Sequence, residues 1–364
     1  MPLIDQPTAV RAGEELDAAA LAAYLARTVP AFAGATADEL EVQQFGAGFS
    51  NLTYLVRAGD AEAVLRRPPF GARGGSAHDM AREHRILAAL APTYGKVPRP
   101  LAYCDDPAVL GAPFYVMERV HGVILRGRPP QELALAATTM RALSETFVDE
   151  LAAIHAVDVQ ATGLAELGKP EGYVERQLSG WTRRWTAARS GDVPEIERLA
   201  SWLAAHQPPE SAGGAPAALI HNDFKYDNLV LAPDDLTRVI AVLDWEMATV
   251  GDPLMDLGTS LGYWVEPDDP LELRALGLGL TALPGNLTRA ELVARYAERT
   301  GRAVPPERAA FYYAYGLFKI AVVAQQIYAR YVAGHTKDPR FARLDVAVRA
   351  LGGAAERVAA RGAL

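Results

Sequence analysis

The spacing of apolar residues changes along the chain from the alternation typical of strands to the longer period typical of helices. Residues 39–59 and 61–69 alternate apolar and polar positions and end in glycine or proline, so they predict strands. Helical spacing marks several other segments, at 16–27, 77–90, 138–156, 172–189, 287–301 and around 309–333. The pattern predicts an α+β protein whose sheet comes early and whose remainder is mainly helical.

Three short apolar runs interrupt the later helical pattern. PAALI (216–220), NLVLAP (228–233) and VIAVLD (239–244) are too short for typical helices, so each predicts a strand. DDLTR (234–238) is the turn expected between the last two runs. The first connection is HNDFKYDN (221–228), in which a His, two Asp, a Lys and two Asn lie close together in sequence.

This predicted hairpin brings together side chains with complementary chemistry. Asn228 opens one strand and Asp244 ends the next, so we expect them side by side, offering the oxygen ligands that Mg²⁺ prefers. Asp223 lies on the loop, where it can reach a substrate hydroxyl, and Lys225 can neutralise charge on a phosphoryl group in transfer. The coincidence of these residues with strands on both sides favours a phosphoryl-transfer site over an ordinary solvated turn.

The early strands offer a nucleotide site. Gly46, Gly48 and Ser50 lie in a loop between strands, where glycine lets the backbone approach phosphate oxygens. A Gly-x-Gly turn alone is a weak signal, because most such turns only connect strands.

A cation is expected behind those phosphates. Arg66 fits the alternation of its strand better than Arg67, although either could anchor the phosphates. Glu83, on the following amphipathic helix, is the carboxylate expected to pair with a basic residue of this strand. Arginine can pair with a carboxylate through two hydrogen bonds, but it is bulkier than lysine and not equivalent to it.

The composition and net charge limit the kinds of molecule that the chain is expected to bind. The chain has 364 residues and a net charge of −8, which argues against extended contact with nucleic acid but does not exclude ATP bound with Mg²⁺. Cys104 is the only cysteine, so no intrachain disulfide can form, as suits a reducing cytoplasm. The first residues show no signal peptide, and the apolar segment 309–333 contains Lys319, so we expect neither secretion nor a membrane span.

The motif HxDxKxxN followed by a strand-terminal Asp resembles the catalytic loop and metal-binding Asp of the protein-kinase-like superfamily. The form HNDFKYDN…VIAVLDWE…GDPLMDL is similar to its aminoglycoside phosphotransferase branch. This resemblance implies a two-lobed, protein-kinase-like α+β fold, with a small antiparallel-sheet N-lobe and a larger, mainly helical C-lobe. The corresponding division is a tail and helix at 1–35, the N-lobe at 36–118 and the C-lobe at 119–364.

The resemblance also implies roles for individual residues. Asp223 would be the catalytic base, Asn228 and Asp244 would bind Mg²⁺, and His221 would brace the loop. Three residues of the last N-lobe strand and hinge would lie beside the adenine of ATP: Met117, Glu118 and Val120. Two Asp of GDPLMD, Asp252 and Asp256, would support the backbone of the catalytic loop.

Several passages are similar to a narrower subgroup, among them VLRRPP, REHRIL, VLGAPFYVMERV, GYVERQLSGW and FKIAVVAQQIYARYVAG. This subgroup contains the kinase-like N-terminal domains of certain acyl-CoA dehydrogenase family proteins and their stand-alone bacterial relatives. Its members carry Arg in the VLR position, as this chain does at Arg66. The resemblance implies a hydroxyacyl-CoA or hydroxy acid as acceptor, rather than an aminoglycoside.

The leading hypothesis is therefore a small-molecule kinase that uses ATP and Mg²⁺ and phosphorylates an alcohol group. A catalytically weak nucleotide-binding module is the alternative. A protein kinase is less favoured, because GDPLMDL follows DWE with no room for a long activation loop. Tyr263 and Trp264 are candidates for the wall of the acceptor site. The acceptor, the choice between ATP and GTP and the oligomeric state stay open at this point.

Overall fold

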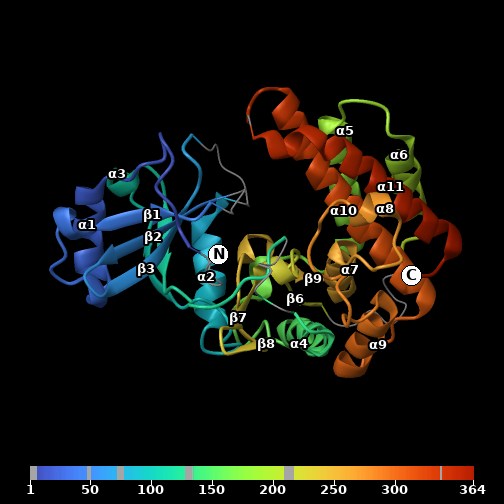
Figure 1. Ribbon diagram of the computed structural model, residues 1–364, viewed down its shortest axis with the longest axis horizontal. Helices are drawn as coiled ribbons and strands as arrows, with labels where there is room; N and C mark the ends of the chain where they lie inside the picture. Colours follow the sequence, from blue (N-terminus) through green and yellow to red (C-terminus); the bar gives the residue numbers. More distant parts are fainter. Residues whose placement is uncertain are drawn as a thin grey trace. The chain divides into compact units, whose positions relative to one another are not determined.

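The computed structural model describes residues 6–46, 51–71, 78–127, 133, 135–208, 217–336 and 338–364. They form two compact units (Figure 1). The sheet unit contains the described residues up to Ile124 together with Asn228–Met247, and the helical unit contains Leu125–Asp227 and Ala248–Leu364. The sequence pattern did not predict that residues 228–247 belong to the first unit. The division into 1–35, 36–118 and 119–364 stays a prediction.

The sheet unit is built on five antiparallel strands in the order β1-β2-β3-β5-β4. These strands are β1 (Glu41–Gln44), β2 (Leu52–Ala58), β3 (Ala61–Arg67), β4 (Pro100–Cys104) and β5 (Phe114–Met117). A two-residue turn joins β2 to β3, and Gly59 in that turn has a φ of +58°, which glycine adopts without the strain that a side chain would bring. A second antiparallel pair, β7 (Leu229–Ala232) and β8 (Asp235–Val242), belongs to the same unit.

Three α-helices complete the described part of the sheet unit: α1 (Ala18–Thr28), α2 (Met80–Leu90) and α3 (Pro107–Leu110). Leu21 and Leu25 of α1 share a core with Tyr54, Leu65 and Phe114 of the sheet. Helix α2 starts later than the predicted residue 77, because the side chain of its N-cap, Asp79, accepts the backbone N–H of Arg82.

The helical unit consists mainly of helices: α4 (Ala137–His155), α5 (Tyr173–Ala188), α6 (Pro194–Ala205), α7 (Pro253–Tyr263), α8 (Leu271–Arg274), α9 (Arg289–Thr300), α10 (Pro306–Val332) and α11 (Leu344–Arg361). A short antiparallel pair, β6 (Ala218–Ile220) and β9 (Thr249–Gly251), lies among them. Helix α10 packs against α5, α7 and α11 (Figure 1). This agrees with the α+β class and the mainly helical second part expected from the sequence.

Two glycines allow α7 and α10 to approach closely. A Cβ atom on Gly316 of α10 would lie 1.9 Å from the carbonyl oxygen of Gly258 in α7, and a Cβ on Gly258 would lie 2.2 Å from the carbonyl oxygen of Tyr312. No real Cβ tolerates such distances, so any side chain here would push the helices apart. The position of α7 therefore depends on this pair of residues.

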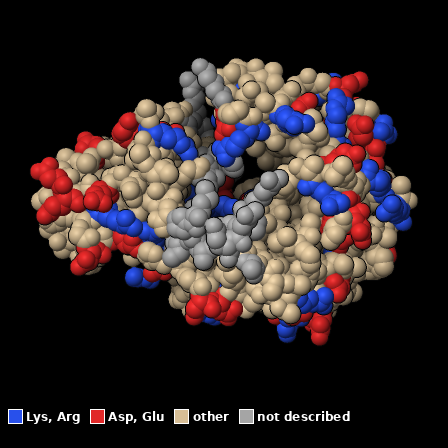
Figure 2. All heavy atoms as spheres, in the orientation of Figure 1, with Lys and Arg blue, Asp and Glu red and all other residues tan. Residues whose placement is uncertain are grey.

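The charged surface is mixed. On the face drawn in Figure 2, the Lys and Arg side chains of the helical unit are interspersed with Asp and Glu. Within the described ranges, no helix has the length and the apolar run that crossing a membrane requires.

The contact between α7 and α10 can be tested with Gly316→Ala. Overpacking of a tight core costs about 1–3 kcal/mol, so we expect the free energy of unfolding to fall by about that much in urea denaturation. Gly353→Ala is the matched control, because a Cβ there meets only the end of Arg357 at 3.5 Å. On helical propensity alone this control should gain about 0.5–1 kcal/mol. Equal stability of the two variants would contradict the proposed packing constraint.

Candidate functional site

The β7–β8 hairpin places Asn228 and Asp244 at the same end. Leu229 pairs with Val242, and the N–H of Leu243 donates to the carbonyl oxygen of Asn228 over 2.8 Å. The two candidate ligands thus lie on facing chain segments, as the sequence predicted. The predicted turn at 234–238 is too long, because β8 already begins at Asp235. The pairing of β7 with β8 shifts in register on both sides of Leu231, which accommodates the additional residues of β8.

Asp244 has an unusual backbone conformation. Its φ is +67°, and among the described residues other than glycine only Asn222 shares a positive φ. Such a conformation costs on the order of 1–3 kcal/mol and persists where the surroundings enforce it, often at functional sites. Here it directs the Asp244 carboxylate to Arg66, whose Nη2 lies 2.7 Å from Oδ1.

Arg66 binds three carboxylates at once. Its guanidinium lies 3.0 Å from Glu83 of α2, 2.7 Å from Asp244 and 2.8 Å from Glu246. Asn51 also donates to Glu246, over 2.7 Å. The expected pairing of Glu83 with a basic residue of β3 is therefore present, and Arg66 makes it.

Burial sets the charge balance of this cluster. It raises the pKa of Glu83, and Arg66 opposes that rise. For Arg66, burial alone would lower the pKa, but Glu83 and Asp244 raise it well above its ordinary value. The guanidinium therefore stays charged among the three carboxylates.

Arg67 faces a different environment. Its side chain is buried, its Nε donates to the carbonyl of Pro68 over 3.2 Å, and its guanidinium lies 3.8 Å from the centre of the Phe70 ring. Alternation along β3 thus separates the two arginines, and only Arg66 belongs to the carboxylate cluster.

The other candidate nucleotide residues are partly described. Gly46 follows β1, and its carbonyl oxygen accepts a hydrogen bond from Arg11 over 3.3 Å. Gly48 and Ser50 lie outside the described residues. Met117 ends β5, and the N–H of Glu118 donates to the carbonyl of Arg99 over 2.9 Å. A nucleotide contact from the Glu118 backbone would consequently use its carbonyl oxygen.

In the helical unit, Asp256 of α7 holds the candidate catalytic loop. Its two carboxylate oxygens accept the backbone N–H groups of His221 and Asn222, each over 2.7 Å. His155 lies 3.1 Å from the same carboxylate. Burial would raise the pKa of Asp256, but the hydrogen bonds and charges of His155 and His221 lower it. Asp256 therefore supports the loop as expected, whereas Asp252 caps α7 and accepts the Tyr312 hydroxyl instead.

Asp223 and Lys225 form a close pair on this loop. Lys225 Nζ lies 2.7 Å from Asp223 Oδ2 and 4.7 Å from the centre of the Tyr263 ring. Burial would lower the pKa of Lys225, but Tyr263 and Asp223 raise it, so the ammonium stays charged. The N–H of Asp223 points to Nδ1 of the fully buried His221, 3.3 Å away, which suits a bracing role for that ring.

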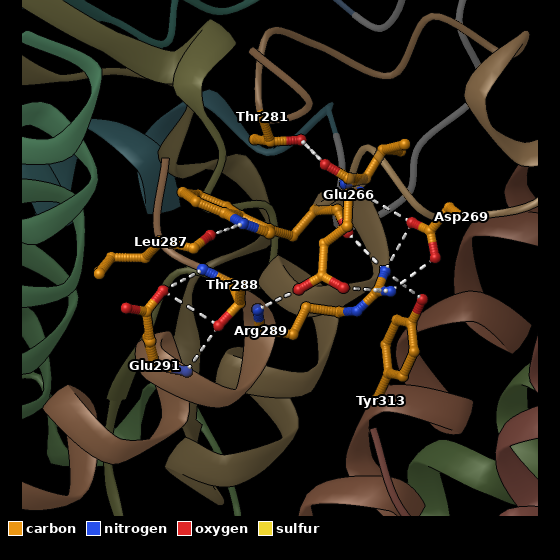
Figure 3. A network of polar contacts seen from close by, with 10 residues as sticks. Glu266, Asp269, Thr281, Leu287, Thr288, Arg289, Glu291 and Tyr313 are labelled. Carbon is orange, nitrogen blue, oxygen red and sulfur yellow. Dashed lines mark hydrogen bonds and ion pairs between the residues drawn. The ribbon is translucent and has the colours of Figure 1, made fainter. Parts of the chain in front are cut away.

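The segment after α7 is fixed by a second ion cluster. Arg289 donates to the carbonyl of Trp264 over 2.9 Å and pairs with Glu266 and Asp269 over 2.9 and 2.6 Å (Figure 3). The Tyr313 hydroxyl lies 2.7 Å from the same guanidinium. Trp264 is buried and its indole N–H donates to Leu287, so our expectation that it lines the acceptor site is wrong. Tyr263, beside Lys225, stays a candidate.

Sequence reasoning missed three side chains of these clusters. Glu246 had a signal, as the last residue of the DWE motif beside Asp244. Asn222 lies in the HNDFKYDN motif but was given no role, and Lys319 had no signal, because their contact joins residues 97 positions apart.

The donor set suits a hard divalent cation. The amide of Asn228 and the carboxylate of Asp244 lie on facing segments and could each offer an oxygen ligand. Within the described ranges, no three His, Cys, Asp or Glu residues gather as a metal-binding group. Few protein ligands are typical of Mg²⁺, which usually keeps waters and binds substrate phosphates.

These features define a protein-kinase-like phosphotransferase. The model of the phosphotransferase enzyme family matches residues 41–303, and the chain belongs to this family. Acyl-CoA dehydrogenase family member 11 from Gallus gallus is 36% identical over 332 residues, which cover 90% of this chain but only 41% of that protein. The chain therefore spans well under half of that relative.

Similar solved structures agree with this family and fold. A Ralstonia eutropha protein, named as a candidate aminoglycoside phosphotransferase, is 32% identical with a TM-score of 0.78, covering 95% of this chain and 99% of that one. A choline kinase from Cryptosporidium parvum is 12% identical with a TM-score of 0.58, covering 93% and 100%, and shows the shared fold alone. The family and the kinase-like fold implied by the sequence motifs are thus confirmed.

The Arg66 cluster can be tested with Arg66→Met. Removing one partner of a buried pair leaves Glu83 uncompensated, so we expect a loss of about 3–5 kcal/mol in the free energy of unfolding. Arg99→Met is the control, because Arg99 and Glu118 are 66% and 40% exposed and such a pair contributes about 0–1 kcal/mol. A urea-unfolding midpoint for Arg66→Met close to that of the control would show that Arg66 is not needed to stabilise Glu83.

Proposed function

We propose that this protein transfers the γ-phosphoryl group of ATP to a hydroxyl group of a small molecule. The observation that carries this proposal is the Asp223–Lys225 pair, on a loop whose backbone is fixed by the buried Asp256. A carboxylate held in this way can orient a hydroxyl and accept its proton, with the neighbouring ammonium beside the transferring group.

Each candidate residue then has a role. Asp223 orients the acceptor hydroxyl and takes its proton, Lys225 balances charge on the phosphoryl group, and His221 braces the loop. Asn228 and Asp244 would hold Mg²⁺, which when bound neutralises phosphate charge. The nucleotide would be bound by the glycine loop, the Arg66–Glu83 ion pair and the hinge: Gly46, Gly48, Ser50, Arg66, Glu83, Met117, Glu118 and Val120.

For the acceptor we propose a hydroxyacyl-CoA or a hydroxy acid. The first support is the similarity to a protein named as an acyl-CoA dehydrogenase family member, over nearly the whole of this chain. The second is electrostatic, because Lys225 and Lys319 both interact with Asp223, the proposed base. Cations beside the base favour an anionic acceptor over the polycationic aminoglycosides.

The direct test is ATP consumption by the purified protein with Mg²⁺ over a panel of acceptors. The panel holds hydroxy acids, their CoA esters, amino sugars and choline-like alcohols. We expect turnover with the hydroxyacyl compounds and a phosphorylated product that mass spectrometry identifies. Turnover only with amino sugars would overturn the acceptor class, and ATP binding without turnover on any acceptor would count against the kinase proposal.

Asp223→Asn tests the base. The amide keeps the shape of the side chain but cannot accept the proton, so we expect kcat to fall by about 10²–10⁴-fold while ATP affinity is retained. Asp235→Asn, at an exposed position of β8, is the control and should keep full activity. Near-normal turnover in Asp223→Asn would remove this residue from the base role.

Asp244→Asn tests the proposed metal ligand. Asparagine tolerates the positive φ of this position, so the change removes charge with little added backbone strain. Titration calorimetry should show Mg²⁺-dependent nucleotide affinity reduced about tenfold or more, since ligand charge sets the affinity for a hard cation. Asp234→Asn, an exposed change in the β7–β8 turn, should leave binding unaltered. Unchanged affinity in Asp244→Asn would exclude a ligand role.

A further inference from the structure

Lys319 is a cation in the interior of the helical unit. It lies in α10, only 3% of its surface is exposed, and the residues on either side of it in the helix are buried and apolar. Its Nζ donates to the carbonyl oxygen of Asn222 over 2.6 Å. The Thr259 hydroxyl of α7 lies 3.4 Å away, and the Trp181 ring of α5 is centred 5.7 Å away.

A lysine is a costly residue at such a position. Burial lowers its pKa to about 8, although Asp223 and Asp256 act to raise it. Lys225 and Arg184 also contribute to the lowering. A leucine or methionine would fill the same space without desolvating a charge. The hydrogen bond to the carbonyl of Asn222 is the interaction that an apolar side chain could not make.

That hydrogen bond acts on the peptide unit joining Asn222 to Asp223. The carbonyl of Asn222 and the N–H of Asp223 belong to one rigid plane. Lys319 holds the oxygen of this plane, and His221 Nδ1 accepts its N–H over 3.3 Å. On the preceding peptide, the N–H of Asn222 is bound by Asp256.

The plane needs such support because Asn222 has a φ of +67°. Asparagine tolerates this left-handed conformation better than most residues, yet the conformation is uncommon outside glycine, so release of its carbonyl would let the chain relax. Relaxation would rotate the backbone from which the Asp223 side chain extends.

We propose that Lys319 is a positioning residue for phosphoryl transfer, which fixes the 222–223 peptide plane and through it the carboxylate of Asp223. The role rests on the proposed function of Asp223. It acts through the backbone and requires no contact between Lys319 and the substrates.

The main test is Lys319→Met, which keeps the length and apolar stem of the side chain and removes the donor. A displacement of about 1 Å at a reacting group can cost 10²-fold, so we expect kcat to fall by about that factor while the KM for ATP stays within about twofold. Hydrogen exchange of the 219–226 segment, measured by mass spectrometry, should become faster. Unchanged kcat and unchanged exchange in this folded variant would overturn the proposal.

Gln325→Met is the matched control. Gln325 is also a buried polar residue of α10, but its side-chain amide donates to the carbonyl of Ala188 over 2.9 Å and to the hydroxyl of Ser190 over 2.8 Å, rather than to the catalytic loop. This variant should retain kcat and normal exchange in 219–226. If it lowered kcat as much as Lys319→Met, the effect would be a general one of α10 and the proposal would fail.

Lys319→Arg supplies a second readout, the pH profile. As pH rises through about 8, Lys319 loses its charge and becomes a weaker donor, so wild-type kcat should decline there. Arginine stays charged, so this alkaline decline should move to higher pH in Lys319→Arg. A decline at the same pH in both proteins would overturn the role of the ammonium.

The exchange measurement separates this inference from the kinase proposal. Faster exchange at 219–226 in Lys319→Met, in a protein with no turnover on any acceptor, would support the positioning contact and reject the function. If the wild-type protein turns over hydroxyacyl acceptors and Lys319→Met shows normal exchange and normal kcat, the kinase proposal is supported and the positioning role of Lys319 is rejected.

Discussion

The arrangement of the candidate catalytic loop depends on one buried carboxylate. Asp256 accepts two consecutive backbone N–H groups, and without it His221 and Asn222 would leave buried donors unpaired. Asp256 is placed by α7, and α7 is placed by its close approach to α10 at Gly258 and Gly316. The position of the proposed base therefore follows from packing between two helices that do not themselves carry it.

In the sheet unit the candidate site residues are held in a different way. There a single guanidinium, that of Arg66, gathers Glu83 from one segment of the chain and Asp244 and Glu246 from another. The backbone strain at Asp244 is maintained by this cluster and by the hairpin. Both positive-φ residues other than glycine in the described chain, Asn222 and Asp244, thus belong to segments held from outside by ionic side chains. Strain concentrated in this way is typical of functional sites.

Local patterns explain what the sequence could predict. The β7–β8 hairpin follows from short apolar runs, and α9 from the reciprocal Thr288–Glu291 cap and the terminal Gly301. The candidate site could be proposed from the family motif, because the residues of that motif lie within a short stretch of sequence. Pairings between distant segments leave no such local trace, and the structure alone gave the partnership of β6 with β9 and that of Lys319 with Asn222. The sequence also could not show that Trp264 is buried, because an aromatic residue has the same sequence signature in a core and in a cleft wall.

The charges around Asp223 bear on the acceptor. Lys225 is directly paired with it, and the buried Lys319 interacts with it as well. The same cations would repel an amino sugar and attract a carboxylate or phosphate ester. Electrostatics thus connects the way the loop is held with the class of molecule it would accept.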